Sequence, residues 1–338
     1  MKRLRVLVYG VTHEHAFGKL ETLRRMPDAF EIVGVVDDRA TATVPNYTNH
    51  PVNPDGFRVF TPAEALSAGG IDFAVIETTN ADLMTIAGVF AERGVPMHCD
   101  KPCGESMEPY RSIVETCRKK NIPFQIGYMY RGNPALKFIR NAVCSGWLGT
   151  VSFIEADMNH DYQHEGYAEY ISSFKGGILY NLGCHLVDIV LSMVNGRFLS
   201  AVPLIGDAPG DPHGSRTSGA SLLSFEGGAR ALIRTSSHMP GGIDGRRLRI
   251  DGTNGTIELC PIERFDGRNL KLKMTLKNPA GGYGAGRNVI DFGILVDRFR
   301  GQLEDLARIV CGDKENDQDY DYDLLVHEVT LRACGIAV

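Results

Sequence analysis

Short apolar runs alternate with longer amphipathic stretches through the first 130 residues. The apolar runs occupy residues 4–9, 31–36, 71–76, 94–98 and 123–128. Runs of this length that end at turn residues predict buried strands, and the stretches between them, with apolar residues three and four positions apart, predict helices. Regular alternation of strand and helix is typical of a doubly wound parallel sheet. We therefore predict an α/β domain with such a sheet over residues 1–127.

The hydrophobic pattern changes after residue 130. One helix is expected at 135–145, and two more near 292–310 and 324–336. The strands predicted by apolar and polar alternation lie at 151–158, 220–225, 229–236, 247–251, 256–259 and 269–276. Because short Gly and Asp turns separate these strands, residues 128–338 are predicted to form an α+β domain with a large, mostly antiparallel sheet.

An antiparallel sheet that helices cover on one side leaves its other face in need of a partner. Apolar and small residues alternate along these strands and indicate that this face is partly apolar, namely Leu222, Ser224, Ala231, Ile233 and Leu248. We therefore expect a homodimer or homotetramer that assembles through the second domain.

Composition and charge exclude several classes of partner. The formal net charge is -5 and no block of Lys or Arg is present, so the chain offers no basic surface for nucleic acid. No apolar run approaches the roughly 20 residues that span a bilayer. The basic start leads into a strand without a small-residue cleavage site, so we expect a cytoplasmic protein with no membrane partner.

The ends of the predicted strands carry features of a dinucleotide site. Gly10 ends the first strand, and Asp37 and Asp38 end the second, at roughly the distance where such folds place a ribose-binding acid. The glycine fingerprint is incomplete, because Thr12 and His15 stand at its second and third positions. A hydroxyl and a helix N-terminus can still donate hydrogen bonds to phosphate. The candidate cofactor-binding residues are Gly10, Thr12, His13, His15, Asp37, Asp38, Thr78, Thr79, Asn80, Asp100 and Lys101.

The cluster His13, Glu14 and His15 raises the question of a metal. Neighbouring side chains in a turn point in different directions, so we expect no metal there. Lys101 is the stronger chemical candidate, because it follows a buried strand at the sheet edge where α/β proteins bind ligands. Its ammonium can interact with a substrate oxygen there, although a surface lysine before the loop residue Pro102 is the alternative.

A second chemical cluster interrupts the strands of the second domain. In the helical stretch 176–188, Asn181, His185 and Asp188 fall at i, i+4 and i+7 and share one face. A histidine with a polar partner can act as a general acid or base, and the alternative is a packing helix whose histidine is only hydrogen-bonded. The preceding stretch 159–167 is dense in groups that hydrogen-bond hydroxyls, which suits a sugar or polyol, or else a solvated connection.

Taken together, these motifs resemble the Gfo/Idh/MocA family (glucose-fructose oxidoreductase, inositol dehydrogenase, rhizopine catabolism) of NAD(P)-dependent oxidoreductases. Residues 99–102 resemble its Glu-Lys-Pro element, 76–80 its strand-end Thr-Pro-Asn, and 128–134 its domain junction. The resemblance implies a Rossmann first domain and a catalytic set of Lys101, which hydrogen-bonds the reacting oxygen, His185, which is the general acid/base, and Asn181. The family usually has an aspartate at the Asn181 position, so a negative charge is missing there.

The candidate substrate-binding residues are Tyr128, Arg131, Asp161, Tyr162, His164 and Tyr180. The predicted function is an NAD-dependent dehydrogenase of a sugar, glycoside or cyclitol. NADP is less favoured, because its 2′-phosphate would meet Asp37, although Arg39 could receive it. The alternatives are a glycosidase that oxidises the sugar transiently with tightly bound NAD, and a non-catalytic dinucleotide-binding sensor.

Overall fold

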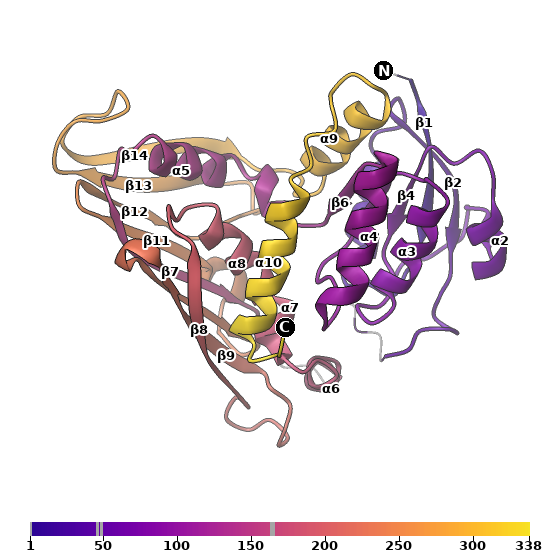
Figure 1. Ribbon diagram of the computed structural model, residues 1–338, viewed down its shortest axis with the longest axis horizontal. Coiled ribbons are helices and arrows are strands. Elements are labelled where there is room, and N and C mark those ends of the chain that lie inside the picture. Colours follow the sequence, from indigo (N-terminus) through magenta and orange to yellow (C-terminus); the bar gives the residue numbers. More distant parts are fainter. Residues whose placement is uncertain (1, 45–46, 48–49, 163–165) are drawn as a thin grey trace. The chain divides into compact units, whose positions relative to one another are not determined.

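A computed structural model describes residues 2–44, 47, 50–162 and 166–338 (Figure 1). The chain forms two compact units. The first comprises Met1–Tyr128 with Phe299–His327, and the second comprises Met129–Arg298 with Glu328–Val338. The expected domains were the continuous ranges 1–127 and 128–338, whereas residues 299–327 here belong to the first unit.

The first unit is built on a six-stranded parallel sheet with the order β3-β2-β1-β4-β5-β6 (Figure 1). Its strands are β1 (Leu4–Tyr9), β2 (Phe30–Val36), β3 (Val59–Phe60), β4 (Phe73–Ile76), β5 (Met97–Cys99) and β6 (Phe124–Ile126). Its helices are α1 (Ala16–Arg24), α2 (Pro62–Ser67), α3 (Leu83–Glu92), α4 (Met107–Lys120) and α9 (Arg300–Val310), while α10 (Tyr320–Ala333) continues into the second unit. The predicted doubly wound parallel sheet is confirmed.

The strand order places the candidate residues of this unit at one edge of its sheet. β1 lies between β2 and β4, so the order of the strands reverses at this point. In open α/β sheets ligands bind outside the carboxyl ends of the strands at such a switch point. Gly10 follows β1, Thr78 follows β4 and Lys101 follows β5, so all three belong to this edge.

The second unit contains an eight-stranded sheet with the order β14-β13-β12-β11-β7-β10-β9-β8. Its strands are β7 (Val151–Asn159), β8 (Phe198–Gly206), β9 (Ser218–Phe225), β10 (Arg230–Ser236), β11 (Arg247–Gly252), β12 (Gly255–Leu259), β13 (Asn269–Leu276) and β14 (Gly286–Ile294). Its helices are α5 (Pro134–Cys144), α6 (Tyr167–Ser172), α7 (Gly177–Asn181) and α8 (Gly183–Leu191). Among the described strands of this sheet, β7 and β10 pair in parallel and the other neighbours pair antiparallel, which confirms a mostly antiparallel sheet.

The structure contains three edge strands that were not predicted, namely β3, β8 and β14. Residues 286–294 form the edge strand β14, so the helix expected from residue 292 begins at Arg300. The other edge strand, β8, was not predicted, and neither was the two-residue edge strand β3. No residue of β8 or β14 is fully buried, so the apolar alternation that identifies a strand is weak in both.

The prediction for the uncovered face of the large sheet was partly wrong. Helices α7 and α8 pack on one face, and Ala231, Ile233 and Leu248 are fully buried rather than on the uncovered face. Leu222 does lie exposed, paired with Val202 of β8 and Leu232 of β10, both exposed as well. Within the described part of the chain, no helix has the length and apolar character that crossing a bilayer requires.

Candidate functional site

The turn after β1 keeps its shape through Gly10 and Asp38. Gly10 has φ +97°, and a Cβ on it would lie 2.5 Å from the backbone nitrogen of Thr78, so only glycine fits. The buried carboxylate of Asp38 accepts hydrogen bonds from the Val11 backbone N–H (2.8 Å) and the Thr12 hydroxyl (2.6 Å). Thr12, at the second fingerprint position, is therefore part of this turn, and the hydrogen bonds to Asp38 hold the turn in place.

Asp37 and Asp38 have different environments although they are neighbours. Asp37 is partly exposed and pairs with Arg39, whose Nε donates to Oδ1 at 2.8 Å. Hydrogen bonds from Arg39 hold the pKa of the Asp37 carboxyl below its usual value. Asp37 is thus the accessible acid at the end of β2, whereas Asp38, also predicted to bind cofactor, is committed to the turn.

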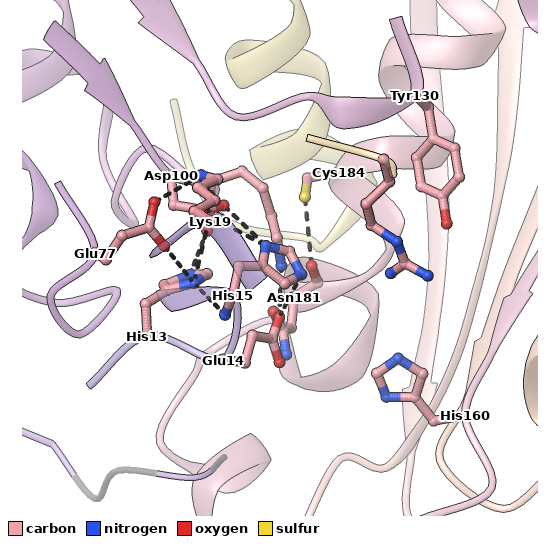
Figure 2. Close-up of polar contacts among 12 residues, drawn as sticks. His13, Glu14, His15, Lys19, Glu77, Asp100, Tyr130, His160, Asn181 and Cys184 are labelled. Atoms are coloured by element: carbon pink, nitrogen blue, oxygen red, sulfur yellow. Dashed lines mark hydrogen bonds and ion pairs between the residues drawn. The ribbon is translucent and has the colours of Figure 1, made fainter. Parts of the chain in front are cut away.

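A buried lysine that sequence reasoning missed connects two carboxylates of this edge. Lys19 on α1 donates to Glu77 at 2.7 Å and to Asp100 at 2.5 Å, and all three side chains are at most 1% exposed (Figure 2). Burial alone would lower the pKa of Lys19, but Asp100 and Glu77 raise it above its ordinary value. The sequence feature that could have revealed a buried Lys19 is that it shares a helix face with the apolar residues Ala16 and Leu20.

The carboxyl groups of this cluster have opposite pKa shifts. Burial raises the pKa of Glu77 well above its usual value, and the nearby Asp100 carboxylate adds to this effect. Burial would also raise the pKa of Asp100, but His13, Lys19 and His15 together hold it well below the usual range. Asp100 is therefore the permanent negative charge of the cluster.

His13, His15 and Asp100 lie close enough together to suggest a metal site, with ligand atoms within 4.8 Å. However, Nδ1 of His13 accepts the His15 backbone N–H (3.1 Å), which requires that Nε2 carry the proton it donates to the Lys101 carbonyl (3.1 Å). Burial lowers the pKa of His13 to about 4, consistent with this neutral form. Neither ring nitrogen of His13 therefore has a lone pair available for a metal ion. His13, His15 and Asp100 are joined by hydrogen bonds instead.

Lys101 is held at both its backbone and its side chain. Its backbone N–H donates to Asp100 Oδ1 (2.7 Å) and its carbonyl accepts from His13. Its buried ammonium donates to Glu14 Oε1 at 2.7 Å. Figure 2 shows His13, Glu14, His15, Lys19, Glu77 and Asp100 gathered around this network. From the sequence, Glu14 is recognisable only as a possible metal ligand, because its partner Lys101 lies 87 residues further along the chain.

Thr78, Thr79 and Asn80 follow the carboxyl end of β4 and are buried. The Thr79 hydroxyl donates to Asp82 at 2.6 Å, and Asp82, not Asn80, is the N-cap residue of α3. Asn80 is therefore not needed to begin the helix.

In the second unit, the predicted single helix over Asn181 and His185 is two helices. α7 ends at Asn181 and α8 begins at Gly183, so the shared-face spacing is interrupted at Leu182. The Cys184 thiol donates to the Asn181 carbonyl at 3.4 Å (Figure 2). Asn181 and His185 are both buried, and the ring of Tyr130 packs edge-on against His185 with centroids 5.1 Å apart. The imidazole is thus held by packing as well as by its helix.

A second buried ion pair, not predicted, fixes Tyr130. Its hydroxyl donates to Glu263 at 2.6 Å, and Arg246 donates to the same hydroxyl (2.9 Å) and to Glu263 (2.7 Å). Burial raises the pKa of Tyr130, so its phenol stays protonated. Arg246 itself lies just before β11, which begins at Arg247.

The predicted substrate-binding residues have varied positions. Tyr128 belongs to the first unit, and Tyr180 is buried in α7. Arg131 pairs with Asp188 through two of its nitrogens (3.0 and 2.7 Å). Asp161 accepts a hydrogen bond from the Gly241 N–H, and the ring centroids of Tyr162 and His160 are 4.1 Å apart. His164 lies outside the described residues.

Comparisons with known proteins agree with this arrangement. Residues 136–258 match the family model described as the GFO/IDH/MocA C-terminal domain. The chain is 27% identical over 205 residues to the rhizopine catabolism protein MocA of Rhizobium meliloti, covering 59% of this chain and 62% of that protein. It is 27% identical over 203 residues to the scyllo-inositol 2-dehydrogenase (NAD(+)) of Bacillus subtilis, covering 58% of this chain and 57% of that enzyme. Both matches span less than two thirds of the relative.

Solved structures share the fold along nearly the whole chain. The UDP-N-acetylglucosamine 3-dehydrogenase GnnA of Acidithiobacillus ferrooxidans has a TM-score of 0.76 at 16% identity, covering 100% of this chain and 98% of that one. GenD2 from gentamicin A biosynthesis, solved in complex with NAD, has a TM-score of 0.74 at 20% identity, covering 98% and 93%.

Proposed function

Because the chain belongs to the Gfo/Idh/MocA family of oxidoreductases, we propose that it transfers a hydride between NAD and the hydroxyl- or keto-bearing carbon of a sugar, glycoside or cyclitol. The observation that carries this proposal is Lys101, a buried ammonium fixed at the carboxyl end of β5. Relatives named as inositol, apiose and xylose dehydrogenases support the substrate class.

The residues of the first unit suit a dinucleotide. The switch point between β1 and β4, the tight turn at Gly10 and the accessible Asp37 are the features that an adenosine ribose and a pyrophosphate require. Asp37 would accept hydrogen bonds from the ribose hydroxyls, and its charge would oppose a 2′-phosphate. NAD is therefore the proposed cofactor, and when bound it supplies the hydride acceptor or donor.

Lys101 and His185 are proposed to have different roles at the substrate hydroxyl: Lys101 acts on its oxygen and His185 on its proton. As an alcohol loses hydride, negative charge builds on its oxygen, and the Lys101 ammonium stabilises that charge more in the transition state than in the ground state. His185 accepts the hydroxyl proton in oxidation and returns it in reduction. Asn181 contributes a hydrogen-bonding amide but no charge.

The uncovered face of the large sheet supports the proposal of a homodimer or homotetramer. Val202, Leu204 and Leu222 leave 64%, 75% and 38% of their surfaces exposed on this face. Beside them, Arg234 and Arg247 pair with Asp157 across the strands, which adds a polar region to the apolar one. A mixed face of this kind suits a second copy of itself. A monomer in light scattering at micromolar concentration would contradict this.

The test of the function is a screen of purified protein with NAD against sugars, glycosides and inositols. Stoichiometric formation of NADH with one of them is the expected result. Release of an aglycone without net NADH would instead indicate the glycosidase. Bound NAD without any turnover would indicate a sensor.

A further inference from the structure

Tyr130 is a buried neighbour of His185, the proposed general base. It lies in the short 3-10 helix Met129–Gly132, which contacts α8. Its ring meets the His185 imidazole at a centroid distance of 5.1 Å and an interplanar angle of 84°. Both residues are at most 2% exposed, so neither ring can turn into solvent. Tyr130 therefore forms one wall of the space that the imidazole occupies.

The α8 helix by itself does not fix the plane of this imidazole. Rotation of a planar ring about its bond to Cβ is broad, so a helical backbone leaves several ring orientations open. A general base must have its nitrogen within about 2.6–3.2 Å of the group whose proton it takes. A perpendicular ring in contact with the imidazole excludes orientations that miss this position, and edge-to-face pairs are favourable in themselves. Tyr130 thus adds to what the helix and the other neighbours of His185 provide.

The hydroxyl of Tyr130 fixes its own ring in turn. It donates a hydrogen bond to Glu263 at 2.6 Å and accepts one from Arg246 at 2.9 Å. Burial would raise the pKa of the Glu263 carboxyl, but Arg298 and Arg246 hold it below its usual value, so the acceptor remains a carboxylate. Hydrogen bonds to ionised partners are shorter and stronger than neutral ones. A phenylalanine at this position would offer the same ring without the anchor.

The anchor belongs to the frame of the large sheet. Arg246 precedes β11, Glu263 follows β12 and Arg298 follows β14. Arg246 and Glu263 pair at 2.7 Å with side chains only 4% and 2% exposed, and Arg298 approaches Glu263 at 3.2 Å. Arg246 also donates to the carbonyl of Asn159, the last residue of β7, at 3.2 Å. The position of Tyr130 therefore depends on the sheet as well as on its own short helix.

We propose that Tyr130 is a positioning residue for proton transfer at His185, and that the buried pair of Arg246 and Glu263 holds Tyr130 in place for this role. The inference rests on the function proposed above and deepens it. Tyr130 acts through His185 and transfers no proton itself, because burial raises the pKa of its phenol. Its effect should therefore fall on the rate of the reaction rather than on substrate binding, and should vanish when His185 is absent.

The kinetic test measures oxidation of the substrate that the screen identifies. Tyr130→Leu should lower kcat roughly tenfold or more while KM stays within about threefold, because a misplaced base slows the reaction without weakening binding. Tyr130→Phe, which keeps the ring and loses the anchor, should lie between wild type and Tyr130→Leu. In a His185→Ala background, Tyr130→Leu should cost less than about twofold more, since the two residues act as one unit. A kcat of Tyr130→Leu within twofold of wild type, or an undiminished loss in the His185→Ala background, would overturn the inference.

Tyr110→Leu is the matched control. Its ring is buried as well and meets an imidazole, that of His327, edge-on at 5.3 Å within the first unit. The same packing is lost in both leucine variants, so a kcat within about twofold of wild type is expected for Tyr110→Leu. An equal loss in the control would show that the effect at Tyr130 is general destabilisation. Glu263 keeps both of its arginines in the Tyr130 variants, so no buried charge loses its partner.

A measurement without substrate separates this inference from the proposed function. In protein labelled with ¹³C at the histidine Cε1 atoms, the NMR signal of His185 is identified by its absence from His185→Ala. Tyr130→Leu should move this signal, and Tyr130→Phe should broaden or split it, because an unanchored ring leaves the imidazole more than one orientation. Tyr110→Leu should leave it unchanged. An unchanged His185 signal in both Tyr130 variants would overturn the inference. If wild type oxidises no sugar or cyclitol, the proposed function fails by itself, and the spectra still decide whether Tyr130 orients His185.

Discussion

The ammonium of Lys19 lies 2.7 Å from a carboxylate oxygen of Glu77, and both side chains are almost completely buried. The same ammonium reaches Asp100, which in turn accepts the backbone N–H of Lys101. One helix residue thus connects the strand ends after β4 and β5. The position of Lys101 depends on this connection, because Asp100 orients its backbone.

Lys19→Met is expected to destabilise the protein by about 3–5 kcal/mol, because it leaves two buried carboxyl groups without their cation. Adding Glu77→Gln should recover part of the loss, since one of those carboxyl groups is then neutral. Urea unfolding measures both effects. Lys2→Ala, which breaks the exposed pair with Asp72, is the control and should leave the midpoint unchanged. A Lys19→Met protein as stable as wild type would contradict the importance of this cluster.

Cofactor preference should follow the exposed carboxylate of Asp37. Wild type is expected to bind NAD at least tenfold more tightly than NADP, because the 2′-phosphate would approach a negative charge. Asp37→Ser should narrow this ratio, mainly by improving the affinity for NADP, which Arg39 can then contact. Fluorescence titration with both reduced cofactors measures the ratio, and tighter binding of NADP by wild type would show that the assignment is wrong.

Catalysis should depend on Lys101 and His185 more than cofactor binding does. Lys101→Met is expected to lower kcat by about two to four orders of magnitude while the Kd for NAD changes little. His185→Ala should remove the rise of the oxidative rate with pH. Asn181→Asp should shift that rise to higher pH, because a carboxylate favours the imidazolium. Near wild-type rates for both Lys101→Met and His185→Ala would assign these residues a structural role.

Three buried histidines predict how stability depends on pH. Burial lowers the pKa of His13 to about 4, of His98 to about 3 and of His327 to about 4, each from 6.5. Between pH 6.5 and 4 the unfolded chain therefore binds more protons than the folded one, so stability falls as the pH falls. Each histidine contributes up to about 1.4 kcal/mol per pH unit.

Urea unfolding at pH 7 and at pH 5 measures this dependence. His98→Gln should reduce the slope by about one proton, because the glutamine amide does not titrate whereas the histidine takes up a proton in the unfolded chain. The fully exposed His213→Gln is the matched control. A free energy of unfolding that does not change between the two pH values would contradict the prediction.

The hydrophobic pattern of the sequence was enough to predict the two kinds of sheet and the strand ends at which the candidate residues lie. Continuous apolar runs indicated parallel strands buried on both faces, and alternating runs indicated strands covered on one face. Because functional residues of α/β folds follow strand ends, Gly10, Asp37, Thr78 and Lys101 could be located without a structure. The edge strands β8 and β14 were not predicted, because their residues are largely exposed and show little alternation of apolar and polar positions.

The pairing of the charged side chains, in contrast, depends on the folded arrangement of the strands and helices. Lys19 reaches Glu77 and Asp100 across 58 and 81 residues, and Lys101 reaches Glu14 across 87. No local sequence pattern predicts such pairs. A charged residue on a helix or in a turn is expected to be solvated, and its partner comes to lie beside it only in the folded sheet. The different uses of Asp37 and Asp38 were hidden for the same reason: neighbours in sequence point to opposite sides of a strand end, one toward solvent and one into the turn.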